Sequence, residues 1–244
     1  MVESASVEIK SLDQIIEAVG TTKALRSIEI TPLSSGRVEE TYLSMRAPVK
    51  AGSLLLKLDS VVEEADVMEA KAKLEEASRA LQRSDTLQQS NGMSEAAIDG
   101  LRAQSKIALA ALKRAQKNLD DRSIRAPFNG LLSLSSVEKG SRIKEGDVIA
   151  TLDDLTQVVV EFSVPENLYG MLSLGNTIRA HAAAFPKRSF VGEIIAIDSR
   201  IESTSRSFKV RAVINNPDLA LPGGMFIHVS IVADNQEALV IPEE

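Results

Sequence analysis

The feature that most constrains the fold is an internal repeat that a long helical segment interrupts. Residues 36–59 align without gaps with residues 130–153, at a constant offset of 94 positions. A copy of about 24 residues is too short to bury a core of its own. We therefore expect the two copies to pack on each other in one module. The identical pairs are Gly36/Gly130, Lys50/Lys144, Gly52/Gly146, Leu58/Leu152 and Asp59/Asp153.

The segment between the copies, residues 60–122, has the composition of a helix. It contains no proline and only two glycines, and it is rich in Ala, Leu, Glu, Lys, Arg and Gln. Apolar and small residues recur at alternating spacings of three and four, which is typical of a coiled-coil seam. The seam positions are Val67, Ala70, Leu74, Ala77, Leu81 and Ser84, and then Ile98, Leu101, Ser105, Ala108, Leu112, Ala115 and Leu119.

Capping residues divide this segment into two helices. Ser60-Val-Val-Glu63 has the pattern of a capping box, in which Glu63 reaches back to the cap, and it predicts a helix start near residue 61. Ser90-Asn91-Gly92 can form a left-handed C-cap, and Ser94 can cap a second helix. Two seams of matching length joined by a tight turn predict an antiparallel coiled-coil hairpin.

The regions on both sides of the hairpin indicate β structure. Short apolar runs rich in Val and Ile alternate with Gly and Pro in residues 1–59 and again from residue 123 onward. We therefore expect a mainly β protein of the α+β class, with an elongated shape because the helical hairpin is inserted into the β module.

Composition excludes several function classes. The chain has no cysteine, a net charge of −6 and eight aromatic residues, which argues against thiolate metal sites and against nucleic acid as a partner. No phosphate-binding glycine motif is present. The only histidines, His181 and His228, lack a nearby second ligand pattern, so we expect no metal, no cofactor and no enzymatic activity. No apolar run reaches the length that spans a bilayer.

The repeat carries a family resemblance. Its two halves, with Gly-x-Val and Val-Lys-x-Gly-x-Leu-Leu-x-x-Leu-Asp, resemble biotinyl/lipoyl domains. Split by a helical hairpin, and with Ile-Arg-Ala-Pro-Phe-Asn-Gly at 124–130, they resemble the periplasmic adaptors (membrane fusion proteins, HlyD-like) of bacterial efflux pumps. The stretches 192–198, 204–212, 216–217 and 221–226 follow the order of that family's β-barrel domain, so the resemblance covers most of residues 20–240.

Three residues depart from the family pattern. Ser205 and Ser207 stand where the family often has threonines around Arg206, and Gly223 stands where a proline is common. The resemblance implies a lipoyl-like β-sandwich at 32–59 and 123–153, the hairpin at 60–122 and a six-stranded β-barrel at 21–31 and 154–235. It also implies a partial membrane-proximal domain, with residues 1–20 as one segment and 236–244 as the start of a truncated part.

The resemblance implies a non-catalytic role between two membranes. A family member of this kind would link an inner-membrane transporter of the resistance-nodulation-division (RND) type to a TolC-like outer-membrane channel, as a homo-oligomer that is hexameric in the assembled pump. The full-length protein would lie in the periplasm of a Gram-negative bacterium, anchored to the inner membrane by a lipid or a transmembrane helix. Its role would be assembly and sealing of the export path for drugs or toxic compounds.

The hairpin tip carries the residues that the resemblance assigns to the channel. RND adaptors commonly have Arg, three residues, Leu, six residues and Ser at the tip, and this chain has Arg83, Leu87 and Ser94 at those spacings. Each also has a simpler interpretation: Ser94 as a cap, Leu87 as a cover for the seam, and Arg83 as a solvated side chain. An exposed Leu suits an apolar anchor, and an Arg offers donors to partner carbonyls.

Other function classes stay open at this point. The same architecture serves adaptors of ABC-type exporters and secretion systems. A biotinyl or lipoyl carrier subunit is a further alternative, but the helical segment occupies the place where a carrier domain bears its modified lysine, and Lys50 and Lys144 belong to the repeated strands. A coiled-coil interaction hub without a transport role is the third class.

Overall fold

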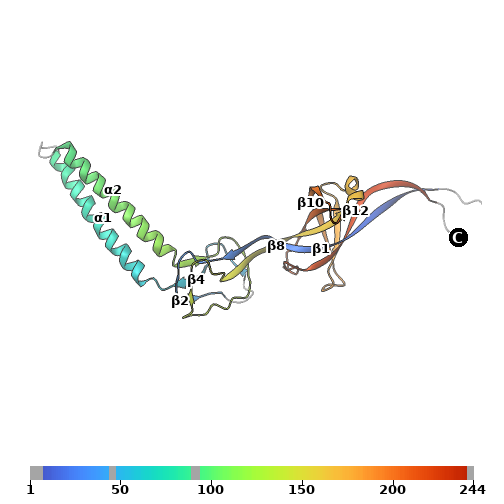
Figure 1. Cartoon of the computed structure of the whole chain (residues 1–244), viewed down its shortest axis with the longest axis horizontal. Coiled ribbons are helices and arrows are strands. Elements are labelled where there is room, and N and C mark those ends of the chain that lie inside the picture. The colour runs from blue at the N-terminus through green and yellow to red at the C-terminus, as the bar shows by residue number, and fades with distance from the viewer. Residues whose placement is uncertain (1–7, 44–47, 89–93, 241–244) are drawn as a thin grey trace, which may run out of the picture. The chain divides into compact units, whose positions relative to one another are not determined.

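The computed structural model describes residues 8–43, 48–88 and 94–240, and the chain divides into two compact units (Figure 1). One unit comprises residues 28–152, and the other comprises residues 1–27 and 153–244. Two long strands, β1 (Glu8–Ile30) and β8 (Ala150–Pro165), run from one unit into the other. Over the described residues the protein is mainly β with a helical hairpin, as predicted.

The unit of residues 28–152 contains both copies of the repeat and both long helices. Its elements are β2 (Gly36–Thr41), β3 (Pro48–Val49), β4 (Leu54–Leu58), α1 (Val61–Gln88), α2 (Glu95–Asp120), β5 (Ser123–Arg125), β6 (Gly130–Leu132) and β7 (Arg142–Ile143). Four of the strands form a sheet in the order β5-β4-β2-β7, and all neighbours with printed registers are antiparallel.

The two copies of the repeat pair with each other symmetrically. In the β2–β7 pair Gly36 lies opposite Ile143, and in the β3–β6 pair Gly130 lies opposite Val49. Moving each residue to its equivalent in the other copy turns Gly36 into Gly130 and Ile143 into Val49, so one pair generates the other. Each half therefore supplies one strand to a pair with its counterpart. The halves are therefore related by an approximate two-fold axis.

The turns obey the same symmetry. The amide of Gly52 donates to the carbonyl of Ala126 at 2.7 Å, and the amide of Gly146 donates to the carbonyl of Pro32 at 3.2 Å. Both glycines have positive φ, 80° and 83°, which a residue with a Cβ rarely adopts. The shared glycines of the repeat thus mark two equivalent turns.

Both halves contribute to one hydrophobic core. Val38 from the first copy and Leu132 from the second are 1% and 5% exposed and belong to the same cluster of buried residues. The other members are Ile30, Leu55, Leu56, Leu58, Ile124, Ala126, Ile143, Ile149, Ala150 and Leu152. The prediction that the two copies pack as one module is confirmed.

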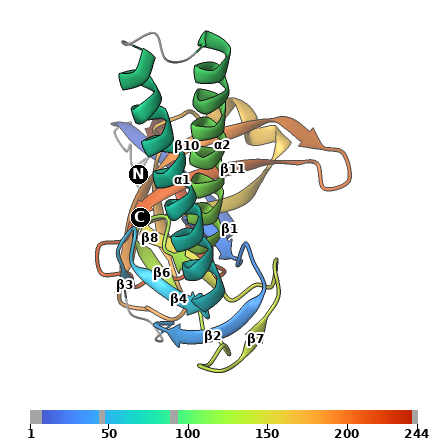
Figure 2. The same cartoon turned by 90° about the vertical axis from the view of Figure 1, so that its left-hand side faces the viewer.

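The helical hairpin forms at the predicted positions. Figures 1 and 2 show α1 and α2 lying side by side and antiparallel. The seam residues Ala70, Ser84, Ile98 and Ala115 are buried, whereas most residues between seam positions are exposed. The turn predicted at Ser90-Asn91-Gly92 lies outside the described residues.

The two helix starts turned out differently. Ser94 caps α2 as predicted, since its side chain accepts from the amide of Ala97. The capping-box prediction for α1 is wrong in its contacts. The Ser60 hydroxyl donates to the Glu64 carboxylate at 2.8 Å, and Glu63 contacts Arg122 instead. The helix still begins at Val61, as expected.

The second unit is built on a six-strand ring of pairings. Its remaining elements are the 3₁₀ helix η1 (Glu166–Met171), β9 (Thr177–His181), β10 (Ser189–Glu202), β11 (Ser207–Asn215) and β12 (Phe226–Val240). The strands pair in the order β1-β12-β9-β10-β11-β8, and β1 also pairs with β8. Alternate residues of these strands, such as Val158, Val160, Phe162 and Val164, point into a core of their own.

No helix in the described part of the chain is both long and apolar enough to cross a membrane. The finer domain bounds predicted above, including the separate barrel and membrane-proximal parts, stay predictions.

Candidate functional site

The tip of the hairpin carries the three residues predicted to bind a partner. Arg83 lies in the next-to-last turn of α1, Leu87 lies in its last turn, and Ser94 directly precedes α2. Since α1 and α2 are antiparallel neighbours, the structure brings these positions to the same end of the hairpin (Figure 1). The side chain of Leu87 is outside the described part of the structure.

Arg83 and Ser94 differ in how they are held. Arg83 is exposed and makes no ion pair with any residue that the structure describes, so its guanidinium can reach a partner. Ser94 is also exposed, but its hydroxyl oxygen accepts from the amide of Ala97 and has a structural role at the helix start. A partner contact at Ser94 would share the hydroxyl with this cap.

The seam ends just below the tip with a buried polar residue. Ser84 is 2% exposed, and its hydroxyl donates to the carbonyl of Leu81 at 2.7 Å. This local bond satisfies the hydroxyl inside the helix pair. The small side chain lets the helices stay close up to the tip.

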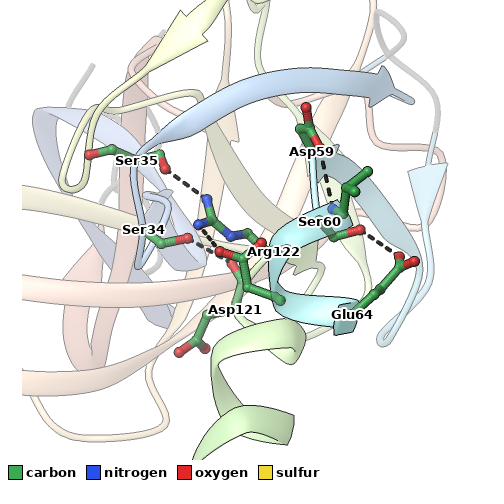
Figure 3. Close-up of polar contacts among 9 residues, drawn as sticks. Ser34, Ser35, Asp59, Ser60, Glu64, Asp121 and Arg122 are labelled. Carbon is green, nitrogen blue, oxygen red and sulfur yellow. Dashed lines mark hydrogen bonds and ion pairs between the residues drawn. The ribbon is translucent and has the colours of Figure 1, made fainter. Parts of the chain in front are cut away.

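The base of the hairpin is organised by Arg122, which follows Asp121, the C-cap residue of α2 (Figure 3). Its side chain is 19% exposed, and its guanidinium donates to the carboxylate of Glu63 in the first turn of α1 and to the carbonyl of Ser35 at 2.8 Å. Its own carbonyl accepts from the amide of Leu58 in β4. One arginine therefore connects both helices with the strands beneath them.

Close packing surrounds this guanidinium. A Cβ on Gly36 would lie 3.0 Å from Nη1 of Arg122, so glycine leaves the room that the side chain needs. The Nε atom of Arg122 is buried and has no hydrogen-bond partner within the described chain. The two terminal nitrogens of the guanidinium thus connect the first turn of α1 with the residue that precedes β2.

Neighbouring polar groups complete the base (Figure 3). The Asp59 carboxylate accepts from the amide of Val61 at 3.3 Å, and the Ser34 hydroxyl donates to the carbonyl of Asp121 at 3.4 Å. Sequence reasoning missed this network because it assigned Glu63 to a capping box. The available signal was the basic residue three positions after Leu119, the last seam residue of α2.

The two histidines lie closer than the sequence indicated. His181 on β9 is directly opposite His228 on β12, and both are exposed. Strand pairing brings together these two histidines, which are 47 positions apart in the sequence. Among the residues that the structure describes, no group of three His, Cys, Asp or Glu side chains could hold a metal ion.

The chain is similar to one known domain family and to two characterised relatives. Residues 157–235 match the family described as "CusB-like, beta-barrel domain". The chain is 27% identical to the nodulation protein NolF of Rhizobium meliloti (strain 1021), covering 92% of this chain and 65% of NolF. It is 26% identical to the multidrug resistance protein MdtA of Escherichia coli O45:K1 (strain S88 / ExPEC), covering 99% of this chain and 64% of MdtA. The chain thus spans less than two thirds of either relative.

A solved structure shares the fold over nearly the whole chain. The MacA–MexA chimeric protein, which contains the Pseudomonas aeruginosa MexA α-hairpin domain, superposes with a TM-score of 0.86 at 21% identity. The match covers 98% of this chain and 88% of the chimera. At this identity the likeness concerns the fold alone.

Proposed function

We propose that this chain, which shares the sequence pattern and fold of the membrane fusion proteins (periplasmic adaptors) of efflux pumps, links an inner-membrane transporter to an outer-membrane channel. The family resemblance predicted from the sequence is confirmed by the CusB-like β-barrel match, the relatives MdtA and NolF, and the shared fold of the MacA–MexA chimera. The finer assignment, an RND-type transporter and a TolC-like channel, rests on the hairpin.

One observation carries the proposal. Val38 and Leu132 belong to two halves of a single core, and these halves directly precede and follow the two-helix hairpin in the chain. The hairpin buries its seam within itself and has a firmly held base at Arg122, so its tip is free to contact another protein. Such an arrangement suits adhesion and spacing, and it offers no cleft with convergent catalytic groups in the described residues.

The proposed mechanism is mechanical. The tip residues Arg83, Leu87 and Ser94 dock on the channel, and six copies surround the export path in the periplasm. The six-strand ring acts as the β-barrel domain of the family and, with the lipoyl-like module, contacts neighbouring copies and the transporter. The full-length protein is anchored in the inner membrane. The short hairpin and the tip triple favour an RND transporter over an ABC exporter.

The decisive experiment is the substitution Leu87→Asp in the full-length protein in cells. We expect loss of drug tolerance and loss of crosslinking between the hairpin tip and the outer-membrane channel, because a carboxylate at an apolar anchor must be desolvated on docking. Ile107→Asp is the matched control, since Ile107 is 66% exposed in the middle of α2, away from the tip.

Protein abundance and helical content separate a docking defect from misfolding. Unchanged efflux together with unchanged crosslinking for Leu87→Asp would contradict the docking role. If Leu87→Asp and Ile107→Asp reduce efflux equally, the tip is not the specific site.

A further inference from the structure

We propose that His181 and His228 form a two-histidine site for a borderline transition-metal ion, Cu²⁺ or Zn²⁺, on the outer face of the six-strand ring. The site belongs to the unit of residues 1–27 and 153–244, and it goes beyond the proposed adaptor function. It departs from the expectation, drawn from the spacing of the two histidines in the sequence, that the chain binds no metal.

Strand pairing places the two imidazoles side by side. His181 on β9 is directly opposite His228 on β12 in an antiparallel pair. Directly opposite residues of neighbouring strands point to the same face of a sheet. The adjacent residues Ala180 and Val229 are buried in the core of the ring, whereas both histidines are exposed. Both side chains therefore point outward from one patch of the sheet.

The distance between opposite positions suits joint coordination of one ion. The Cβ atoms of directly opposite residues lie about 4.5–5.5 Å apart. Two imidazole nitrogens that each bind the same ion at about 2.0–2.1 Å must lie about 3 Å from each other. Rotation of the two side chains covers this difference, so they can meet at one ion while the strands keep their register.

Both imidazoles lack partners within the described part of the chain. Neither His181 nor His228 makes a hydrogen bond or an ion pair with a described residue. Their neighbours in the same row are Val19 on β1 and Ser189 on β10, which carry no charge. One nitrogen of each neutral ring is therefore available to bind a metal ion.

A hollow beside the histidines leaves room for the rest of the coordination shell. Its volume is about 420 Å³, and Glu17 and Ser230 line it together with both histidines. A water molecule occupies about 30 Å³, so several waters fit beside the ion. The Glu17 carboxylate is exposed and makes no ion pair in the described ranges, so it favours a cation in this hollow.

One cationic side chain lies on the same face. Arg179 on β9 is exposed and lies opposite Ser230, and Glu17 on β1 lies opposite Ser230 from the other side. The charges of Arg179 and Glu17 therefore oppose each other near the histidines. The affinity of the site for a metal ion must come from the imidazole nitrogens and not from net charge.

The ligand type selects the class of ion. Imidazole nitrogen suits Cu²⁺, Ni²⁺ and Zn²⁺, and Cu²⁺ binds most tightly in this series. Ca²⁺ and Mg²⁺ prefer oxygen ligands. The chain has no cysteine, so no thiolate competes for the ion. Two protein ligands completed by water leave positions open for exchange, which suits reversible binding.

Zinc titration of the untagged full chain, followed by NMR, tests the site. The chain has just two histidines, so single substitutions assign both imidazole signals. We expect Zn²⁺ to shift both signals together with one midpoint, and Mg²⁺ to leave them unchanged. His181→Gln and His228→Gln should each lower the affinity for Zn²⁺ by roughly tenfold or more, because only one imidazole remains.

A register control keeps both histidines but separates them. Arg179→His/His181→Gln moves the β9 histidine to the position opposite Ser230, away from His228. This variant should bind Zn²⁺ no more tightly than the single His→Gln variants. Electron paramagnetic resonance of bound Cu²⁺ gives a second readout: we expect coupling to two imidazole nitrogens in the wild type and to one in either single variant.

Three results would overturn this inference. They are a titration in which Zn²⁺ shifts neither imidazole, separate midpoints for the two histidines, or a register control that binds as tightly as the wild type. The readout does not involve the hairpin tip. Leu87→Asp should retain Zn²⁺ binding whatever its effect on efflux, so failure of the docking proposal and failure of the metal site are distinguishable.

Discussion

Val38 and Leu132 lie in one hydrophobic core, although 94 positions and both long helices separate them in the sequence. Each occupies the same place in its copy of the repeat, and each is almost completely buried. This relationship makes the hairpin an insertion in a folded module, and its consequences can be measured.

Truncation of Leu132 should destabilise the module that carries the hairpin. We expect Leu132→Ala to lower the free energy of unfolding by about 2–5 kcal/mol, through lost burial and a cavity. Urea unfolding followed at 222 nm reports on this unit, because α1 and α2 both belong to it. Leu134→Ala is the control, since Leu134 is 74% exposed. Equal effects of the two substitutions would refute the shared core.

Arg122 and Glu63 should behave as a coupled pair. Removing either group leaves its partner partly buried without compensation, so we expect Arg122→Met and Glu63→Gln each to cost about 1–3 kcal/mol. The double variant should cost less than the sum, and a double-mutant cycle in the same urea assay measures the coupling. Additive effects would show that the ion pair contributes nothing to the base.

Hydrogen exchange gives a second measurement for Arg122. The Arg122→Lys variant keeps the charge but loses the planar fork to Glu63 and the Ser35 carbonyl. Relative to the wild type, we expect the exchange rate to rise more in the first turn of α1 than in the middle of the helix. Exchange that rises equally along the whole helix would indicate global destabilisation instead.

Gly20 should be required where β1 meets β8. A Cβ at this position would lie 2.8 Å from the carbonyl oxygen of Glu161 and 2.9 Å from Cβ of Phe162. We expect Gly20→Ala to cost about 1–3 kcal/mol because two backbones must separate. Gly223→Ala is the control, since its Cβ would make only an ordinary contact at 3.6 Å.

Tyr169 can report on this unit alone. The chain has two tyrosines and no tryptophan, and Tyr169 packs edge-to-face on Phe208 with ring centroids 4.9 Å apart. In a Tyr42→Phe background, fluorescence therefore follows unfolding of the six-strand ring. If Gly20→Ala and Gly223→Ala have the same free energy of unfolding in this assay, a tight β1–β8 contact is excluded.

The unit that contains the six-strand ring, residues 1–27 and 153–244, should lose stability in acid. Hydrogen bonds from Thr156 and then Arg26 lower the pKa of the Asp154 carboxyl. The hydrogen bond from Lys23, with help from Arg211, lowers the pKa of Glu161 against the opposing effect of burial.

The direction of the pH effect follows from these shifts. Both folded-state pKa values lie below the unfolded values of about 4, so the contribution is complete above about pH 5 and is lost as the pH falls through the folded values. Asp154→Asn should flatten this acid limb in the Tyr169 assay. An unchanged acid limb would show that Asp154 is not among the groups responsible.

The local sequence pattern was sufficient to predict the helical hairpin. Helix periodicity and caps such as Ser94 act over a few residues, so the seams, the helix start at Val61 and the antiparallel pair could be predicted without tertiary information. The repeat added the expectation of one shared core, because a copy of that length cannot fold alone.

For the residues proposed to bind a partner, the sequence predicted only their position. Spacing placed Arg83, Leu87 and Ser94 at the tip, and the structure agrees with that placement for the helix positions. The ion pair at the base of the hairpin was not predicted, because Glu63 lies 59 positions before Arg122 and no local rule connects these two residues.

The two helices, the Ser94 cap of α2 and the existence of two matching β halves follow from the sequence alone. The tertiary structure alone decided that β2 pairs with β7 and β3 with β6, that His181 faces His228, and that Glu63 serves Arg122 rather than its own helix cap. The physical reason is range. Helical hydrogen bonds and seams join residues three or four positions apart, whereas strand pairing joins distant residues whose register depends on the packing of the whole core.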